Sequence, residues 1–62
     1  MMIEIALLVS HAELKLHISA AKQCIRDNDY MMYMYNKKEI RIYLNEIAEN
    51  KAELLKAMFN AN

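Results

Sequence analysis

Asp27-Asn28-Asp29-Tyr30 separates two long segments of helical periodicity, and this short break decides the fold. Asn and Asp side chains compete for backbone hydrogen bonds and tolerate the left-handed conformation, so they end helices where glycine is absent. The sequence contains no glycine and no proline, the residues that most often form turns and strand ends. A connection this short makes the two neighbouring helices antiparallel.

Apolar residues before the break recur at helical spacing, which predicts one apolar stripe along a helix. The members of this stripe are Ile3, Leu7, Leu14, Ile18, Ala21 and Ile25. Other faces of the same segment carry Ile5, Leu8, Val9, Ala12 and Leu16. A helix that is apolar nearly all round needs burial on more than one side, so this segment indicates an intermolecular interface.

The segment after the break has a second stripe, formed by Ile40, Leu44, Ile47, Leu54 and Met58 and widened by Tyr43, Ala48 and Leu55. Its acidic residues, Glu39, Glu46, Glu49 and Glu53, are expected on a solvated outer side. Lys51 interrupts the stripe, either by extending to its edge or by setting the register of the helices. The pattern again predicts a helix that buries one side.

We therefore predict an all-α fold, a two-helix antiparallel hairpin that forms a single domain over residues 1–62. The first helix is expected from about residue 2 to 27, and the second from about residue 30 or 37 to 60. A domain of about 60 residues is marginally stable alone. Because the chain is 56% hydrophobic, we expect a homo-oligomer, a dimer that forms an antiparallel four-helix bundle.

In length and layout this architecture resembles the plasmid copy-number regulator Rop. The resemblance concerns architecture only, because the two share no sequence motif. Neither site residues nor RNA binding are carried over from it.

A second interpretation is a small α+β fold with the order ββαββα. Ser10-His11-Ala12-Glu13 and Asn36-Lys37-Lys38-Glu39 look like two capping boxes, 26 residues apart, and the segments after them alternate apolar and polar residues as strands do. The similarity is either a faint duplication or chance. The absence of glycine from the required hairpin turns argues against strands.

No constellation of residues indicates catalysis or metal binding. His11 and His17 do not converge on one helix face, and His17 and Cys24 share a face but lie about 10 Å apart along the axis. Ser10 and His11 have no third group to orient them, and Ser10 is interpreted as a cap or turn residue. Glu13 and His17 are expected to pair on the surface. We expect no enzyme, no cofactor and no metal.

The most unusual local feature is a run of Tyr and Met residues followed by basic residues. The predicted partner-binding residues are Tyr30, Met31, Tyr33, Met34, Tyr35, Lys37, Lys38 and Arg41. Tyr and Met suit an adaptable protein-binding patch. Alternatively, the aromatic rings stack on bases while the basic residues meet phosphates, or the run simply closes the core of the hairpin.

The sequence favours a small non-enzymatic regulator or inhibitor that acts by protein–protein contact, with a nucleic-acid-binding module and a self-assembling structural subunit as alternatives. Zero net charge argues against binding DNA mainly by counterion release. Ile, Asn, Lys, Met and Tyr are abundant, which is typical of A/T-rich coding sequence and suggests a phage, another mobile element or an A/T-rich bacterium. The apolar start, Met1 to Val9, is a poor signal peptide and too short to cross a bilayer. With one free thiol, we expect a cytoplasmic protein without membrane contact.

Overall fold

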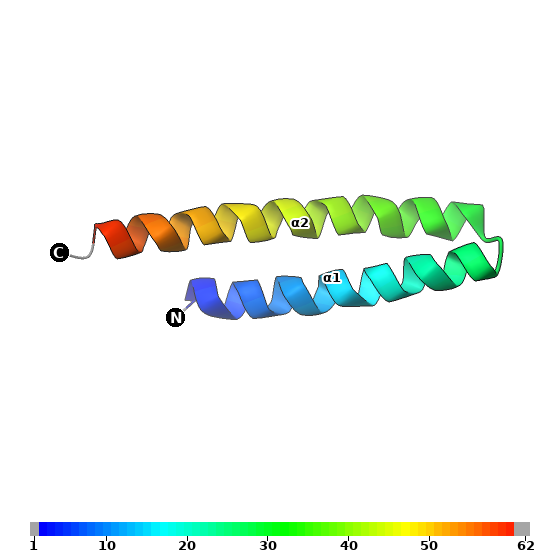
Figure 1. Ribbon diagram of the computed structural model, residues 1–62, viewed down its shortest axis with the longest axis horizontal. Helices are drawn as coiled ribbons and strands as arrows, with labels where there is room; N and C mark the ends of the chain where they lie inside the picture. The colour runs from blue at the N-terminus through cyan, green and yellow to red at the C-terminus, as the bar shows by residue number, and fades with distance from the viewer. Residues whose placement is uncertain (1, 61–62) are drawn as a thin grey trace.

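A computed structural model describes residues 2–60, which form two antiparallel α-helices and no strand (Figure 1). Helix α1 is Met2–Arg26 and helix α2 is Tyr30–Phe59. The predicted helical hairpin is confirmed. Of the two starts considered for the second helix, residue 30 is correct and residue 37 is wrong, and the ββαββα alternative is wrong.

The connection between the helices is a Schellman motif in which asparagine takes the place of glycine. Asn28 is the non-glycine residue with positive φ, at 55°, among the described residues. The Asp29 amide donates to Cys24 O at 2.9 Å and the Asn28 amide donates to Ile25 O at 3.3 Å, which are the two bonds of this motif. Asp29 also caps α2, because its Oδ1 accepts from the Met32 amide at 3.2 Å.

The molecule is a rod, with principal extents of 53 × 14 × 12 Å. Helix α2 has 30 residues and α1 has 25, so α2 continues beyond the start of α1 (Figure 1). The turn occupies one end of the rod, while α1 begins and α2 ends towards the other. Neither helix carries an apolar stretch long enough to cross a membrane, within the residues that the structure describes.

The seam between the helices follows a heptad-like pattern on both of them. Its shielded members are Ile3, Leu7, Ser10, Leu14, His17, Ala21 and Cys24 on α1, and Tyr33, Asn36, Ile40, Tyr43, Ile47, Asn50 and Leu54 on α2. Spacings that alternate between three and four keep a residue facing the partner helix at every turn. Yet Ala21 and Ile47 are the buried hydrophobic residues within residues 2–60, and Ser10 and Asn36 are equally well buried.

The structure overturns the interpretation of Ser10 and Asn36 as helix caps. Both residues lie inside continuous helices, and both are only 4% exposed. The capping-box pattern is a local signal, a cap residue followed three positions later by Glu. Here the side chains of Ser10 and Asn36 bond to the other helix instead, and neither capping box marks the start of a helix.

Only some residues of the two apolar stripes are buried between the helices. Ala21 and Ile47 are buried, and Leu7, Leu14, Ile40 and Leu54 are half-buried. Other members of the same stripes remain exposed: Ile18, Ile25, Leu44 and Met58. The reason is that polar residues occupy much of the seam, so each stripe is rotated to one side of it.

Candidate interaction surface

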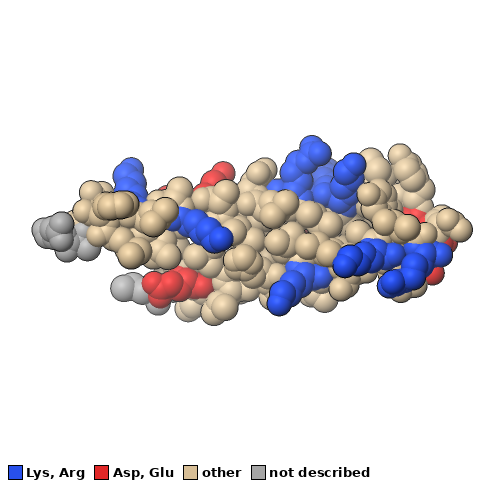
Figure 2. Space-filling view, viewed as in Figure 1, with Lys and Arg blue, Asp and Glu red and all other residues tan. Residues whose placement is uncertain are grey.

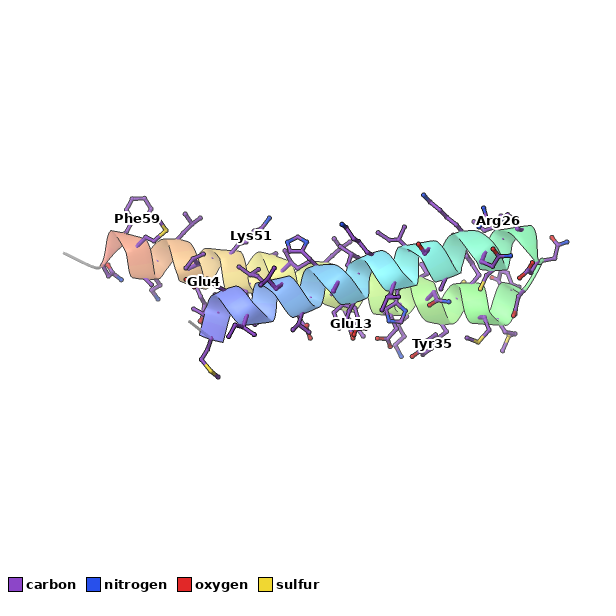
Figure 3. All side chains as sticks on the ribbon, turned by 90° about the horizontal axis from the view of Figure 1, so that it is seen from below. Glu4, Glu13, Arg26, Tyr35, Lys51 and Phe59 are labelled. Atoms are coloured by element: carbon purple, nitrogen blue, oxygen red, sulfur yellow. The ribbon has the colours of Figure 1, made fainter. Side chains whose placement is uncertain are left out.

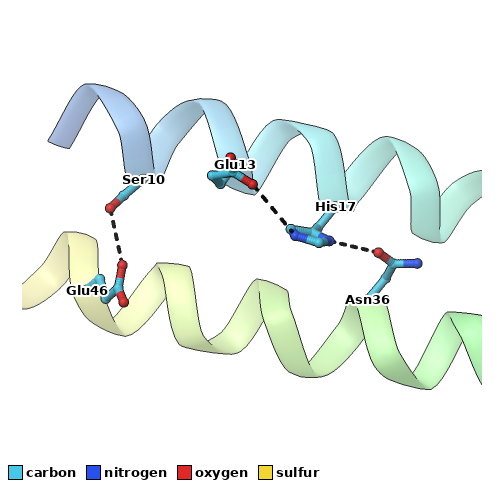
Figure 4. A network of polar contacts seen from close by, with 5 residues as sticks. All are labelled: Ser10, Glu13, His17, Asn36 and Glu46. Atoms are coloured by element: carbon cyan, nitrogen blue, oxygen red, sulfur yellow. Dashed lines mark hydrogen bonds and ion pairs between the residues drawn. The ribbon is translucent and has the colours of Figure 1, made fainter. Parts of the chain in front are cut away.

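A network of polar side chains joins the two helices through the seam (Figure 4). At one point Ser10 Oγ donates to Glu46 Oε2 at 3.4 Å. At another, His17 Nδ1 lies 2.8 Å from Asn36 Oδ1. Within the described residues, no buried side-chain nitrogen or oxygen lacks a partner. The seam is therefore polar without leaving unpaired groups, which would be costly.

Asn36 is the residue that organises this network. Its Nδ2 donates to Met32 O at 2.9 Å and to Cys24 Sγ at 3.8 Å. The amide nitrogen is thereby used, so Oδ1 acts as the acceptor and His17 Nδ1 as the donor. His17 Nε2 then faces Glu13 Oε2 at 3.9 Å, the i,i+4 pair expected from the sequence.

Two tyrosines enclose the His17 ring. The Tyr43 ring stacks on it with a centroid distance of 5.6 Å, and the Tyr35 ring meets it edge-on at 6.2 Å. Desolvation raises the pKa of the Tyr43 phenol above its usual value of 10.0, and the nearby carboxylates of Glu13, Glu39 and Glu46 raise it further. The neutral phenol is therefore the form that the folded hairpin favours.

This network serves to hold and orient helices. The polar groups of Ser10, His17 and Asn36 are each bonded to another residue of the hairpin. Within residues 2–60, no group of three or more His, Cys, Asp or Glu side chains is arranged to hold a metal ion. The surfaces outside the seam carry the remaining features.

The predicted partner-binding run does not form one patch, because a helix distributes its members around α2. Tyr30 and Tyr33 line a depression of about 310 Å³ beside the turn, together with Ile25 of α1. A smaller depression of about 170 Å³ lies on α2 alone and is lined by Met34, Lys37, Lys38 and Arg41. Tyr35 lies elsewhere, against His17, and Met31 is 78% exposed.

The hairpin has two broad faces that differ in charge. One, which we term the acidic face, includes Glu13, Tyr35, Glu39 and Glu46, the groups gathered around Tyr43. Glu53 follows Glu46 by seven residues and so continues this side of α2. In Figure 3, Glu13 and Tyr35 lie along one edge of the hairpin, and Lys51 and Phe59 lie along the other.

We term the other side the basic-edged face. Ile25, Tyr30 and Tyr33 line one depression, which places these parts of both helices on the same side. Helical spacing extends this side along both helices. Its apolar residues are Leu7, Leu14, Ile18, Ile25, Tyr30, Tyr33, Leu44 and Leu55, and its charged residues are Glu4, Lys15, Lys22, Lys37, Arg41 and Lys51.

Figure 2 shows the basic-edged face. Lys and Arg side chains lie along both margins, and an uncharged band runs between them, crossed near one end by a basic side chain. Acidic side chains on this view are confined to isolated places near the ends and the upper margin. Zero net charge in the sequence therefore conceals a separation of charge across the hairpin. The sequence feature that corresponds to this separation is the seven-residue spacing of Glu39, Glu46 and Glu53, which keeps all three on one side of the α2 seam.

Comparisons with models of protein families, with curated proteins and with solved structures find no match to this chain.

Proposed function

We propose that this chain is a small non-enzymatic regulator or inhibitor that acts by binding another protein. The observation that supports this proposal is the distribution of large apolar side chains. Leu16 is 63% exposed, Ile25 is 62% exposed and Leu44 is 51% exposed, whereas Ser10 and Asn36 occupy buried positions in the seam. A hairpin arranged in this way gains much more by covering its outside than by its own packing.

The energetics point the same way. Burial of apolar surface contributes about 25 cal/mol per Å², and a domain of about 60 residues has little stability to spare. With Ala21 and Ile47 as the buried hydrophobic residues within residues 2–60, the hairpin has a very small apolar core. Association with a partner supplies the missing burial. We include a homodimer with a four-helix core among the assemblies that this proposal covers.

The residues proposed to contact the partner are those of the Tyr/Met run and the basic residues that follow it. Tyr30, Tyr33 and Lys37 lie on the basic-edged face, and Met34, Lys38 and Arg41 extend the surface around α2. Tyrosine and arginine are frequent in the centres of protein interfaces. The half-buried thiol of Cys24 is consistent with a reducing compartment, and we propose the cytoplasm, with a phage or mobile element as the source.

A second candidate is a small RNA- or DNA-binding module. It is favoured by the depression that Lys37, Lys38 and Arg41 line together with Met34. Three cations on one helix side can meet successive phosphates, while nearby tyrosine rings stack on bases. A third candidate is a structural subunit whose partner is itself.

Affinity capture with the tagged chain tests these candidates. The tag is placed at the end of the rod away from the turn, and the bacterial lysate is used with and without nuclease. A defined protein that survives nuclease supports the regulator, and it should be lost with Tyr30→Ala combined with Lys37→Ala. The matched control is Phe59→Ala, which removes another largely exposed aromatic ring at the far end of α2.

Other outcomes argue against the regulator. Retention that disappears on nuclease treatment, and that weakens steeply with salt, would instead establish the nucleic-acid module. Recovery of the chain alone from the lysate of its own host would argue against both binding functions and support the self-assembling subunit.

A further inference from the structure

We infer that the basic-edged face binds an acidic amphipathic helix of a partner protein. This inference rests on the proposed function and deepens it by stating the chemistry of the partner. It follows from the shape of the face, from its charge and from the position of the chain's own acidic residues.

The shape of the face suits a helix. Two antiparallel helices that pack side by side leave a long shallow groove above their seam, and a third helix can lie along it. The apolar members of the groove on α1, Leu7, Leu14, Ile18 and Ile25, are spaced by seven, four and seven residues. Leu7 and Leu14 belong to the seam and Ile18 and Ile25 lie beside it, while Glu4 and His11 precede Ile18 on the same line of α1. Apolar contacts therefore recur along most of this side of α1. On α2, Lys37, Leu44 and Lys51 follow one another every seven residues opposite it, so Leu44 lies between two cations.

The charge of the face selects an acidic partner. Helical spacing places Lys15 and Lys22 on the α1 margin and Lys37 and Lys51 in line with Leu44 on α2. Figure 2 shows Lys and Arg side chains along both margins of this face, so a helix that lies on it has cations on both sides. An apolar stripe flanked by glutamate or aspartate meets these cations at the rim, while lysine or arginine is repelled. Such complementarity contributes more to specificity and association rate than to affinity.

The chain's own surfaces are less suitable occupants. A second copy placed with its basic-edged face against the first brings lysine margins against lysine margins. A second copy placed with its acidic face against the groove brings Glu13, Glu39 and Glu46 over the apolar stripe, where their desolvation is unfavourable. The acidic partner therefore fits the groove better than another copy of this chain.

The probe for this inference is a synthetic helix with leucine at the a and d heptad positions and glutamate at e and g. A matched peptide carries lysine at e and g instead. Binding of each peptide to the full chain is measured by fluorescence anisotropy at low and high salt. We expect the glutamate peptide to bind at least about tenfold more tightly than the lysine peptide, with an advantage that shrinks as salt rises.

Two pairs of variants locate the site. Ile18→Glu places a charge in the groove and should abolish binding, whereas Leu16→Glu on another side of α1 should leave it unchanged. Both positions are exposed, so neither change disturbs the seam. Lys37→Glu combined with Lys51→Glu should reverse the preference and favour the lysine peptide. Circular dichroism confirms that each variant remains helical.

Three results would overturn the inference. Equal affinity for the two peptides would show that charge does not select the occupant, and equal damage from Ile18→Glu and Leu16→Glu would place binding elsewhere. Self-association that strengthens with salt and excludes both peptides would show that a second copy covers the face despite its like-charged margins. If a captured protein binds the Ile18→Glu variant as well as the unchanged chain, this inference is refuted but the proposed regulator is not. If no protein is captured, the proposed regulator is refuted.

Discussion

His17 Nδ1 and Asn36 Oδ1 lie 2.8 Å apart and join the two helices across the seam (Figure 4). Asn36 is buried in the seam and His17 is half-buried there, and each is directed at the other by a further contact within its own helix. Asn36 donates to Met32 O, and His17 faces Glu13. The pair thus fixes which turns of the two helices lie opposite each other.

Breaking this pair from one side should be costly. In Asn36→Leu the donor on His17 loses its acceptor, and the free energy of unfolding should fall by about 1–3 kcal/mol. His17→Leu should have a comparable effect. In the double variant no polar group is left unpaired, so its loss should be smaller than the sum, with a coupling energy of about 0.5–3 kcal/mol. Urea unfolding followed by circular dichroism measures all four proteins, and strictly additive losses would contradict the bond.

The asparagine of the turn should be sensitive to substitution. Because Asn28 has a φ of 55°, Asn28→Ala should lower the free energy of unfolding by about 1 kcal/mol. Asn28→Gly should preserve or raise it, since glycine adopts this conformation freely. The control is Asn45→Ala on the exposed side of α2, which should have little effect. Equal stability of the Ala and Gly variants at position 28 would show that the turn is not under this constraint.

The closest packing in the hairpin should not tolerate a larger side chain. Ala21 is 8% exposed, so Ala21→Leu should separate the helices and reduce stability by about 1–3 kcal/mol. The same substitution at exposed Ala12 enlarges a surface side chain and should be nearly neutral. Thermal unfolding of both variants makes the comparison, and a neutral Ala21→Leu would mean that the helices adjust their separation easily.

Alkaline pH should weaken the hairpin through Tyr43. Desolvation and the neighbouring carboxylates raise the pKa of this phenol in the folded state above 10.0. The unfolded chain therefore loses this proton first as pH rises. The stabilising contribution is complete below about pH 10 and is lost as pH rises through the raised pKa. Tyr43→Phe should flatten this part of the profile of stability against pH, while Tyr30→Phe, far from Glu13 and Glu46, should not.

The sequence predicted the hairpin and its turn well, because these depend on local signals. Asp27 to Asp29 end one helix and cap the next through bonds between residues close in the chain, and apolar periodicity marks the two helices. Ser10 and Asn36 were misread for the same reason. A capping box is defined locally, yet the partners of these side chains are Glu46 and His17, far away in sequence.

The candidate surfaces were harder to predict. The Tyr/Met run is contiguous in sequence, but a helix turns about 100° per residue, so Tyr33 and Tyr35 fall on different faces. The separation of acidic from basic side chains was also missed. It depends on which side of the seam each residue lies, and that is settled only when the register of the two helices is known.

The two ends of the rod differ (Figure 1). The turn and the start of the Tyr/Met run lie at one end, and the outer ends of both helices lie towards the other. A domain fused to the chain would therefore be attached away from the turn. With a long dimension of 53 Å, the rod separates its turn from its outer helix ends by several nanometres. A group joined beyond the outer helix ends therefore lies several nanometres from the turn and from Tyr30, which lines the depression beside it. Fluorescent labels, affinity tags and surface tethers placed there report on or anchor the protein without approaching the tyrosines.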